Sequence, residues 1–347
     1  MKWHTACRSL AFFALLSLMS ITATAYSAFH DGSDESCAGC HKSDSLLNKT
    51  DPSSTCLECH AKSYRVLSET GSVYTPAGDF YWLTQSYANS RQGGWGERHG
   101  HNVIAADFGL VADTTLVTAP SNGPVAYQSA WLQCTSCHDP HVTAQNSYRL
   151  LGNTNYNGGS MAAGGFKFKN PAPIALACLN SNGEFLAETD RDHPDYGVGM
   201  SEWCTNCHSG YNGYGKHPTG NRTRLNRVAT QYNVYKATGL ITGQRGVSYD
   251  FLVPFERGWA ETSRLRCNRT DGPTATANVM CLSCHRAHAS AFDSIGRWDF
   301  RVEFLSTSEV LSSPDGHHAY YGNDINIRYG PLQRELCNKC HIKDKTR

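Results

Sequence analysis

Apolar residues follow one another over a long stretch only near the start of the chain, at Leu10–Met19. Lys2 and Arg8 give the preceding residues a positive charge, and small residues follow. This arrangement is typical of a secretory signal peptide, and its apolar part is too short to span a membrane. We expect residues 1–28 to be the signal peptide, or cleavage to follow Ala25.

Beyond this segment, hydrophobic and polar positions rarely keep a helical or strand period for long. Glycine makes up 31 of 347 residues, and stretches such as Asn153–Gly165 and Asp271–Asn278 are typical of loops. We therefore predict mostly coil, with short helices and little or no sheet. No later segment reaches about 18 uncharged apolar residues, so we expect no transmembrane span in the mature chain.

One pattern, Cys-x-x-Cys-His, occurs six times. In c-type haem proteins the two thiols bind the haem covalently and the adjacent His binds its iron. The copies are Cys37–His41, Cys56–His60, Cys134–His138, Cys204–His208, Cys281–His285 and Cys337–His341. The predicted haem-attachment residues are Cys37, Cys40, Cys56, Cys59, Cys134, Cys137, Cys204, Cys207, Cys281, Cys284, Cys337 and Cys340, and the iron ligands are His41, His60, His138, His208, His285 and His341.

Other uses of Cys-x-x-Cys explain this pattern less well. A zinc site takes four ligands and does not require a His directly after each Cys pair. A thioredoxin-like redox pair occurs once, in a βαβ setting. Six c-type haems are therefore the predicted cofactors. Their attachment outside the cytoplasm agrees with the signal peptide.

The haems also change the predicted fold. A chain with so little regular structure does not readily offset its ordering entropy by side-chain burial alone, and six macrocycles supply apolar surface. About 53 residues per haem are too few for a separate domain around each one. We expect a multihaem cytochrome c fold, with one elongated hexahaem domain over residues 29–347.

Histidines outnumber the second axial positions that six haems would leave open. Met ligands are scarce, so the surplus favours bis-His ligation, low potential and no iron site open to a substrate. His141 and His288 stand three residues after a motif His, too close to ligate the same iron, and would serve neighbouring haems. The candidates are His30, His99, His101, His141, His193, His217, His288, His317 and His318.

Cysteine and charge add two further expectations. Cys178 and Cys267 remain outside the motifs and the leader, and either form a disulfide or stay as buried thiols. The chain is formally +1, so twelve haem propionates would make the holoprotein acidic. The sequence contains no basic stripe that would indicate nucleic-acid binding.

Several longer strings resemble the OmcS-type family of outer-surface hexahaem c-type cytochromes, which polymerise into conductive extracellular nanowire filaments. These strings include Gly96–Asp107, Leu110–Pro120, Cys134–His141, Gly199–His208, His217–Asn221, Cys281–Asp293 and Gln333–His341, and the haem order agrees. The resemblance implies a mostly coiled fold, bis-His haems in a row that continues between subunits, and distal ligand roles for His30, His101, His141, His217 and His288.

One position departs from that family. In the family, a His three residues after the first motif's His ligates the fifth haem of the adjacent subunit. The corresponding residue in this chain is Asp44. The sixth distal ligand would then be His317 or His318, with His99 and His193 behind them. If no other His serves the fifth haem, the junction between subunits differs from that of the family.

Three functions follow from these features. The first is a secreted subunit of a head-to-tail electron-conducting filament, fed by upstream cytochromes and delivering electrons to extracellular acceptors such as metal oxides. The second is an unpolymerised periplasmic or surface electron carrier. The third, a multihaem oxyanion reductase, needs one open haem iron. The six intact motifs argue against it, so we expect no enzyme.

Overall fold

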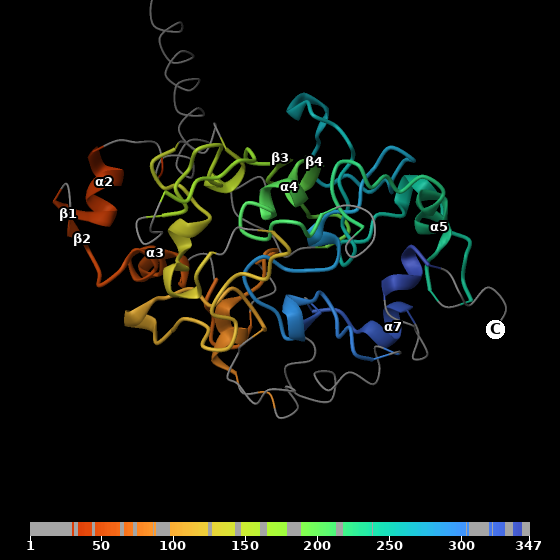
Figure 1. Ribbon diagram of the computed structural model, residues 1–347. Helices are drawn as coiled ribbons and strands as arrows, with labels where there is room; N and C mark the ends of the chain where they lie inside the picture. The colour runs from red at the N-terminus through yellow and green to blue at the C-terminus, as the bar shows by residue number, and fades with distance from the viewer. Residues whose placement is uncertain are drawn as a thin grey trace, which may run out of the picture.

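Short helices and strands separated by long irregular segments make up the computed structural model (Figure 1). Residues 30, 34–43, 46–62, 66–71, 75–85, 87, 98–123, 127–142, 147–159, 165–178, 189–212, 218–237, 239–302, 304, 319–320, 322–329 and 336–341 are described. The predicted signal peptide, Asp44, His217, His317 and His318 lie outside these residues. The mostly coiled fold is confirmed.

The regular elements are few and short. The α-helices are α2 (Asp34–Cys40), α3 (Pro52–His60), α4 (Met200–Cys204), α5 (Val228–Val234) and α7 (Ile325–Tyr329). The strands are β1 (His41–Ser43), β2 (Leu46–Leu47), β3 (Ile174–Leu176) and β4 (Asp195–Val198). Single 3-10 turns are η1 (Phe80–Thr84), η2 (Ala106–Phe108), η3 (Ser129–Trp131), η4 (Cys134–Ser136), η5 (Tyr148–Leu150), η6 (Arg245–Val247), η7 (Thr262–Arg264), η8 (Cys281–Ser283), η9 (Asp293–Ile295) and η12 (Leu336–Lys339). In the part of the chain that the structure describes, no helix is long and apolar enough to cross a membrane.

The elements follow one another across the molecule. In Figure 1, α2 and its two strands lie at one end, whereas α5 and α7 lie at the other. Strands β1 and β2 pair antiparallel, as do β3 and β4. Isolated bridges extend the second pair: Tyr196 lies parallel to Glu256, which pairs with Asn278, which in turn pairs with Arg224. Three distant chain segments thus extend the β3–β4 pair into one local β layer.

Helix α3 begins at a well-formed N-cap. Asp51 is the N-cap, and one carboxylate oxygen accepts the Ser54 N–H at 2.8 Å. Its other oxygen accepts the Ala106 N–H at 2.8 Å, and this bond ties the start of α3 to η2. Proline at the first helical position needs no N–H partner there. The helix therefore holds Cys56 to His60 in a fixed orientation.

Aromatic side chains and buried ion pairs fill the centre. Phe251, Tyr232 and Trp298 are almost fully buried in the main apolar cluster. The side chains of Arg257 and Asp195 are also buried, and the Arg257 Nε–H donates to Asp195 Oδ1 at 2.8 Å. A buried charge is tolerated when it has a partner of opposite charge. This ion pair therefore fixes the position of the segment around Arg257 against β4.

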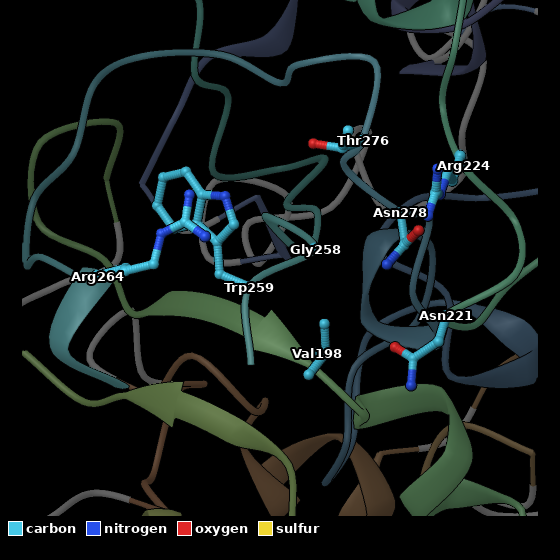
Figure 2. Close-up of a pocket in the computed structure, with 8 residues that line it drawn as sticks. All are labelled: Val198, Asn221, Arg224, Gly258, Trp259, Arg264, Thr276 and Asn278. Carbon is cyan, nitrogen blue, oxygen red and sulfur yellow. The ribbon is translucent and has the colours of Figure 1, made fainter. Parts of the chain in front are cut away.

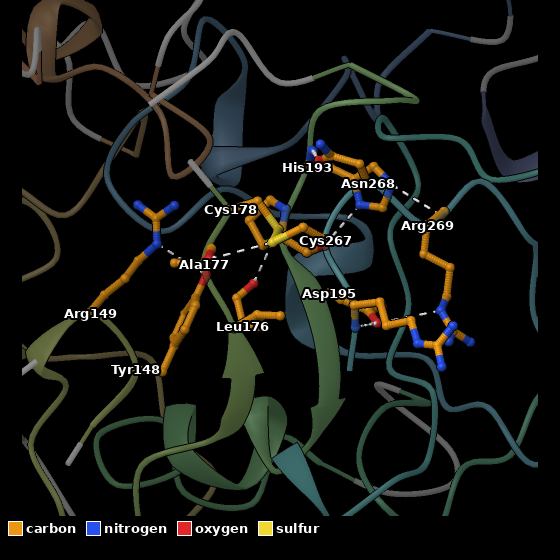
Figure 3. The surroundings of a disulfide bond; sticks show 12 residues. Tyr148, Arg149, Leu176, Ala177, Cys178, His193, Asp195, Cys267, Asn268 and Arg269 are labelled. Atoms are coloured by element: carbon orange, nitrogen blue, oxygen red, sulfur yellow. Dashed lines mark hydrogen bonds and ion pairs between the residues drawn. A yellow bond between two sulfur atoms is a disulfide. The ribbon is translucent and has the colours of Figure 1, made fainter. Parts of the chain in front are cut away.

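A disulfide joins Cys178 to Cys267, with the α-carbons 5.3 Å apart (Figure 3). It links the chain just after β3 to the segment before Arg269, across 89 residues. Of the two states expected for these cysteines, the structure has the disulfide.

Candidate haem sites

Each Cys-x-x-Cys-His motif lies on or at the end of a short helical element, as predicted for a chain of this pattern. The first motif ends α2, the second occupies α3 and the fourth follows α4. The third, fifth and sixth begin in or beside η4, η8 and η12. A helical turn places both cysteines and the following His on neighbouring positions, as covalent attachment to one macrocycle requires.

Four motif histidines face a second histidine. The ring centroids are separated by 6.4 Å for His41–His141, 6.3 Å for His30–His60, 6.2 Å for His138–His288 and 5.8 Å for His101–His208. Two iron–nitrogen bonds of about 2 Å, plus roughly 1.1 Å from each nitrogen to its ring centroid, predict about 6 Å. Each pair therefore leaves the space that one iron between two imidazoles needs.

The Nδ1 atom lies against a backbone carbonyl in three of the paired histidines and in motif His285. Because a carbonyl only accepts, the Nδ1 atom carries the proton, and the Nε2 lone pair is left for a metal. The Nδ1 partners are Arg149 O at 2.8 Å for His138, Ala287 O at 2.6 Å for His101, Pro120 O at 2.9 Å for His208 and Ser294 O at 2.8 Å for His285.

Burial favours the neutral form of three of the paired histidines. It lowers the pKa of His60 and of His208 to about 4, and the pKa of His288 to about 3. A second imidazole nearby adds to the effect in each case. Neutral imidazole is the form that binds iron, so these rings are prepared as ligands at neutral pH.

The third and fifth motifs are built alike. In each, the motif serine accepts the N–H of the residue before the first cysteine: Ser136 accepts from Gln133 at 2.8 Å, and Ser283 accepts from Met280 at 3.1 Å. In each, the carbonyl that binds the motif His comes from a residue with positive φ, Arg149 or Ser294. Two segments about 150 residues apart thus share one local design.

Both motifs also dock on the helix of the motif before them. The Cys134 N–H donates to Ser53 Oγ at 3.0 Å, and the Cys281 N–H donates to Ser201 Oγ at 3.1 Å. Each serine stands three residues before the first cysteine of its own motif. The second and third motifs therefore form one pair, and the fourth and fifth form a second.

The attachment thiols follow one another in sequence order. Within the two docked pairs, the thiols are close enough to hydrogen-bond: Cys56 with Cys134, and Cys204 with Cys281. Between other successive motifs, burial raises the pKa of one thiol, and the charge of a thiol in the neighbouring motif raises it further: Cys59 acts on Cys40, Cys137 on Cys207, and Cys340 on Cys284. The motifs thus form a continuous row from the first to the sixth.

His193 and His99, the two further candidates for the sixth distal ligand, contact tyrosine rings and backbone carbonyls. The His193 ring stacks on Tyr249, and both of its nitrogens lie near carbonyl oxygens, of Pro194 at 2.9 Å and of Arg269 at 3.1 Å. His99 stacks on Tyr87 at 3.6 Å, with Nδ1 against the Ser290 carbonyl. Neither belongs to a histidine pair among the described residues.

Sequence reasoning missed the docking serines and the stacking of Phe80 on His288, whose centroids lie 4.8 Å apart. The recurrence of Ser-x-x-Cys at Ser53 and Ser201 was the available signal. In the ranges described, no three His, Cys, Asp or Glu side chains are grouped as a site for a bare metal ion.

Comparison with known proteins gives one consistent result, although no family model matches the chain. The C-type cytochrome OmcS of Geobacter sulfurreducens is 35% identical over 97% of this chain and 98% of its own length. Two solved structures, the outer membrane cytochrome S filament and the OmcS nanowires of that organism, are 33% and 31% identical with TM-scores of 0.76 and 0.75. Each covers 91% of this chain and 100% of the solved chain. Identity at this level over nearly the whole length shows that the protein belongs to the family of c-type cytochromes that includes OmcS.

Proposed function

We propose that this protein is an extracellular electron-transfer cytochrome that carries six c-type haems and polymerises head to tail into a conducting filament. Haem itself follows from the family, since a c-type cytochrome binds haem covalently. The number six rests on the six intact motifs, with each haem held by the two cysteines of one motif. The haems supply the redox chemistry, and the chain holds and orients them.

The observation that carries the proposal is the set of four imidazole pairs at 5.8–6.4 Å. Two histidines on one iron leave no open position for a substrate, so the haems would pass electrons and would not convert a bound molecule. Bis-His ligation also favours low potentials compared with Met ligation. In this proposal, His41, His60, His138 and His208 are paired with His141, His30, His288 and His101, respectively.

Two motif histidines, His285 and His341, are outside these four pairs in the described part of the chain. We assign their distal ligands to His217 and to one of His317 and His318, the predicted ligands that the four pairs leave over. His217 is the one that the family resemblance supports.

The position of Asp44 supports an intrachain ligand for the fifth haem. His141 and His288, each third after a motif His, face the motif two places earlier in the chain. The same position after the first motif is Asp44. In a head-to-tail polymer, two places earlier is the fifth motif of the adjacent copy, where a carboxylate would be a poor axial ligand. The chain would therefore complete this site itself.

The attachment thiols of successive motifs lie near one another, and this arrangement supports a conducting row of haems. Neighbouring attachment sites lie in contact or close enough to affect each other's pKa along the whole sequence of motifs. The solved OmcS structures are filaments, and we propose the same assembly here. Electrons would enter from upstream cytochromes and leave to extracellular acceptors such as metal oxides, after export through the periplasm. Residues 29–347 would act as one domain.

Electron paramagnetic resonance on the purified oxidised protein tests the ligation. Six low-spin ferric signals are expected, and a high-spin signal in the native protein would point to the reductase alternative. The variant His141→Ala removes a ligand whose side chain is 78% exposed, so its fold should survive and one high-spin haem should appear. His99→Gln is the matched control, because it changes a histidine outside the four pairs.

Negative-stain microscopy of the native protein tests the assembly separately. Filaments are expected. Monodisperse particles with six low-spin haems would instead favour the unpolymerised carrier.

A further inference from the structure

A pocket of about 340 Å³ opens on the β layer that extends β4, beside the segments that lead into the fourth and fifth haem motifs (Figure 2). It contains none of the attachment cysteines or candidate iron ligands. Volumes of this order accept small molecules. The pocket is lined by Val198, Asn221, Arg224, Gly258, Trp259, Arg264, Thr276 and Asn278.

The charged groups of this pocket are both cationic. Arg224 and Arg264 come from opposite sides of it in Figure 2, and no lining residue is acidic. Within the described ranges, Arg264 has one ion pair, with Glu261 at 3.5 Å. Both side chains are more than half exposed, so the pair is weak. Arg224 has no ion pair among the described residues. Guanidinium groups in such a setting favour a carboxylate.

Trp259 holds one of these cations in place. The Arg264 guanidinium lies over its indole ring at 4.6 Å, and the Arg269 guanidinium lies at 4.9 Å. Arg269 is tied to Asp195 and Asp271, whereas Arg264 is the one that reaches the pocket. Stacking orients a planar guanidinium without using its N–H groups, so these remain for a ligand.

A buried acceptor in the pocket has no donor. Asn278 is 2% exposed, and its Oδ1 atom has no hydrogen-bond partner. Its backbone groups are already paired with Glu256, at 2.8 and 3.0 Å. Buried polar side chains are rarely left unsatisfied. This oxygen is itself fully buried, so Asn278 forms part of the pocket wall, and the exposed side chains of Thr276 and Asn221 are the neutral groups that would bind a ligand hydroxyl.

Gly258 leaves one wall of the pocket without a side chain. Gly258 has φ of +78°, and a Cβ there would lie 2.3 Å from the Thr276 carbonyl oxygen. A side chain at this position would move the turn that carries Thr276 and would narrow the cavity.

We propose that this pocket binds a hydroxylated carboxylate, which is a molecule with at least one carboxylate for the two arginines and a hydroxyl for Thr276 and Asn221. A uronic acid unit of an acidic polysaccharide and a free hydroxy acid share this chemistry. A neutral sugar lacks the charge, and a fully ionised oxyanion such as sulfate lacks the donor. The site does not depend on how the haems are liganded or on whether the chain forms filaments.

Isothermal titration calorimetry on the purified holoprotein tests the site with galacturonate, tri-galacturonate, tartrate, galactose and sulfate. Binding of galacturonate or tartrate is expected, at least tenfold tighter than that of galactose or sulfate. Stronger binding of tri-galacturonate than of tartrate identifies the saccharide source, and the reverse identifies the free acid. Equal binding of sulfate, or no binding of any carboxylate, overturns the proposal.

Arg224→Gln and Arg222→Gln form a matched pair, because both residues are exposed and lie two positions apart, and only Arg224 lines the pocket. Arg224→Gln should weaken carboxylate binding at least tenfold, while Arg222→Gln should leave it unchanged. An equal effect of both variants overturns the site. So does a shift of a haem midpoint potential in Arg224→Gln without loss of binding, because the guanidinium would then serve a haem propionate. An unchanged haem spectrum in both variants shows that the fold and the haems are intact.

Discussion

Replacing Cys178 and Cys267 by serine should destabilise the protein strongly, although neither residue touches a predicted haem ligand pair. The disulfide joins the segment after β3 to the segment that carries Arg269, across 89 residues. In the unfolded chain this bond removes much of the freedom of the intervening loop, and that restriction is lost in the double variant.

The magnitude follows from the length of the loop. For 89 residues, the loop-closure relation gives about 4.6 kcal/mol at 25 °C. The proposed His138–iron–His288 bridge would shorten the loop if it survives unfolding, to the chain from His138 to Cys178 and from Cys267 to His288. That path of about 60 residues still gives about 4.3 kcal/mol. Because the dependence on length is logarithmic, the haem bridge does not replace the disulfide.

Guanidinium unfolding of the holoprotein, followed by far-ultraviolet circular dichroism, measures the effect. The double variant Cys178→Ser/Cys267→Ser should lose about 4 kcal/mol of unfolding free energy. Reduction of the unmodified protein should give a similar loss, which serves as the control for the serine side chains. A loss below about 1 kcal/mol would refute the reasoning, because it would show that other contacts already restrict these two segments in the unfolded chain.

Three further changes have defined outcomes. Burial raises the pKa of Glu256 to about 8, so the folded protein keeps a proton that the unfolded chain releases near pH 4.5. Unfolding free energy should therefore fall by about 1.4 kcal/mol per pH unit between these values, and Glu256→Gln should abolish that slope in denaturant titrations across pH 5–8. His101→Met should raise the potential of one haem in spectroelectrochemistry, and identical titration curves would contradict its role as a ligand. Asp51→Ala should cost about 1 kcal/mol in thermal or denaturant unfolding, because α3 loses its N-cap; an unchanged midpoint would contradict this.

The sequence alone predicted the coiled fold and the haem motifs, because both depend on local features. Cys-x-x-Cys-His specifies covalent chemistry within five residues, and a chain rich in glycine and poor in periodicity forms few long elements. The disulfide remained one of two alternatives, since the distance between Cys178 and Cys267 depends on 89 residues of intervening chain.

The pairing of histidines was beyond the reach of local reasoning. His30 lies 30 residues before His60, whereas His288 lies 150 residues after His138, and no pattern of spacing connects the two cases. The family resemblance supplied these histidines as candidate ligands but left their partners open. Docking through Ser53 and Ser201 decides which motifs become neighbours, and such a bond is a property of the folded chain.

The docking of the third motif on α3, and of the fifth on α4, bears on biogenesis. The acceptors Ser53 and Ser201 belong to the earlier element of each pair. If the chain is exported from its N-terminus, as its predicted signal peptide implies, each later motif would dock on an element that has already emerged. Maturation is therefore expected to advance in steps of two attachment sites, and a lesion in an early motif should stall its later neighbour while the preceding pair matures normally.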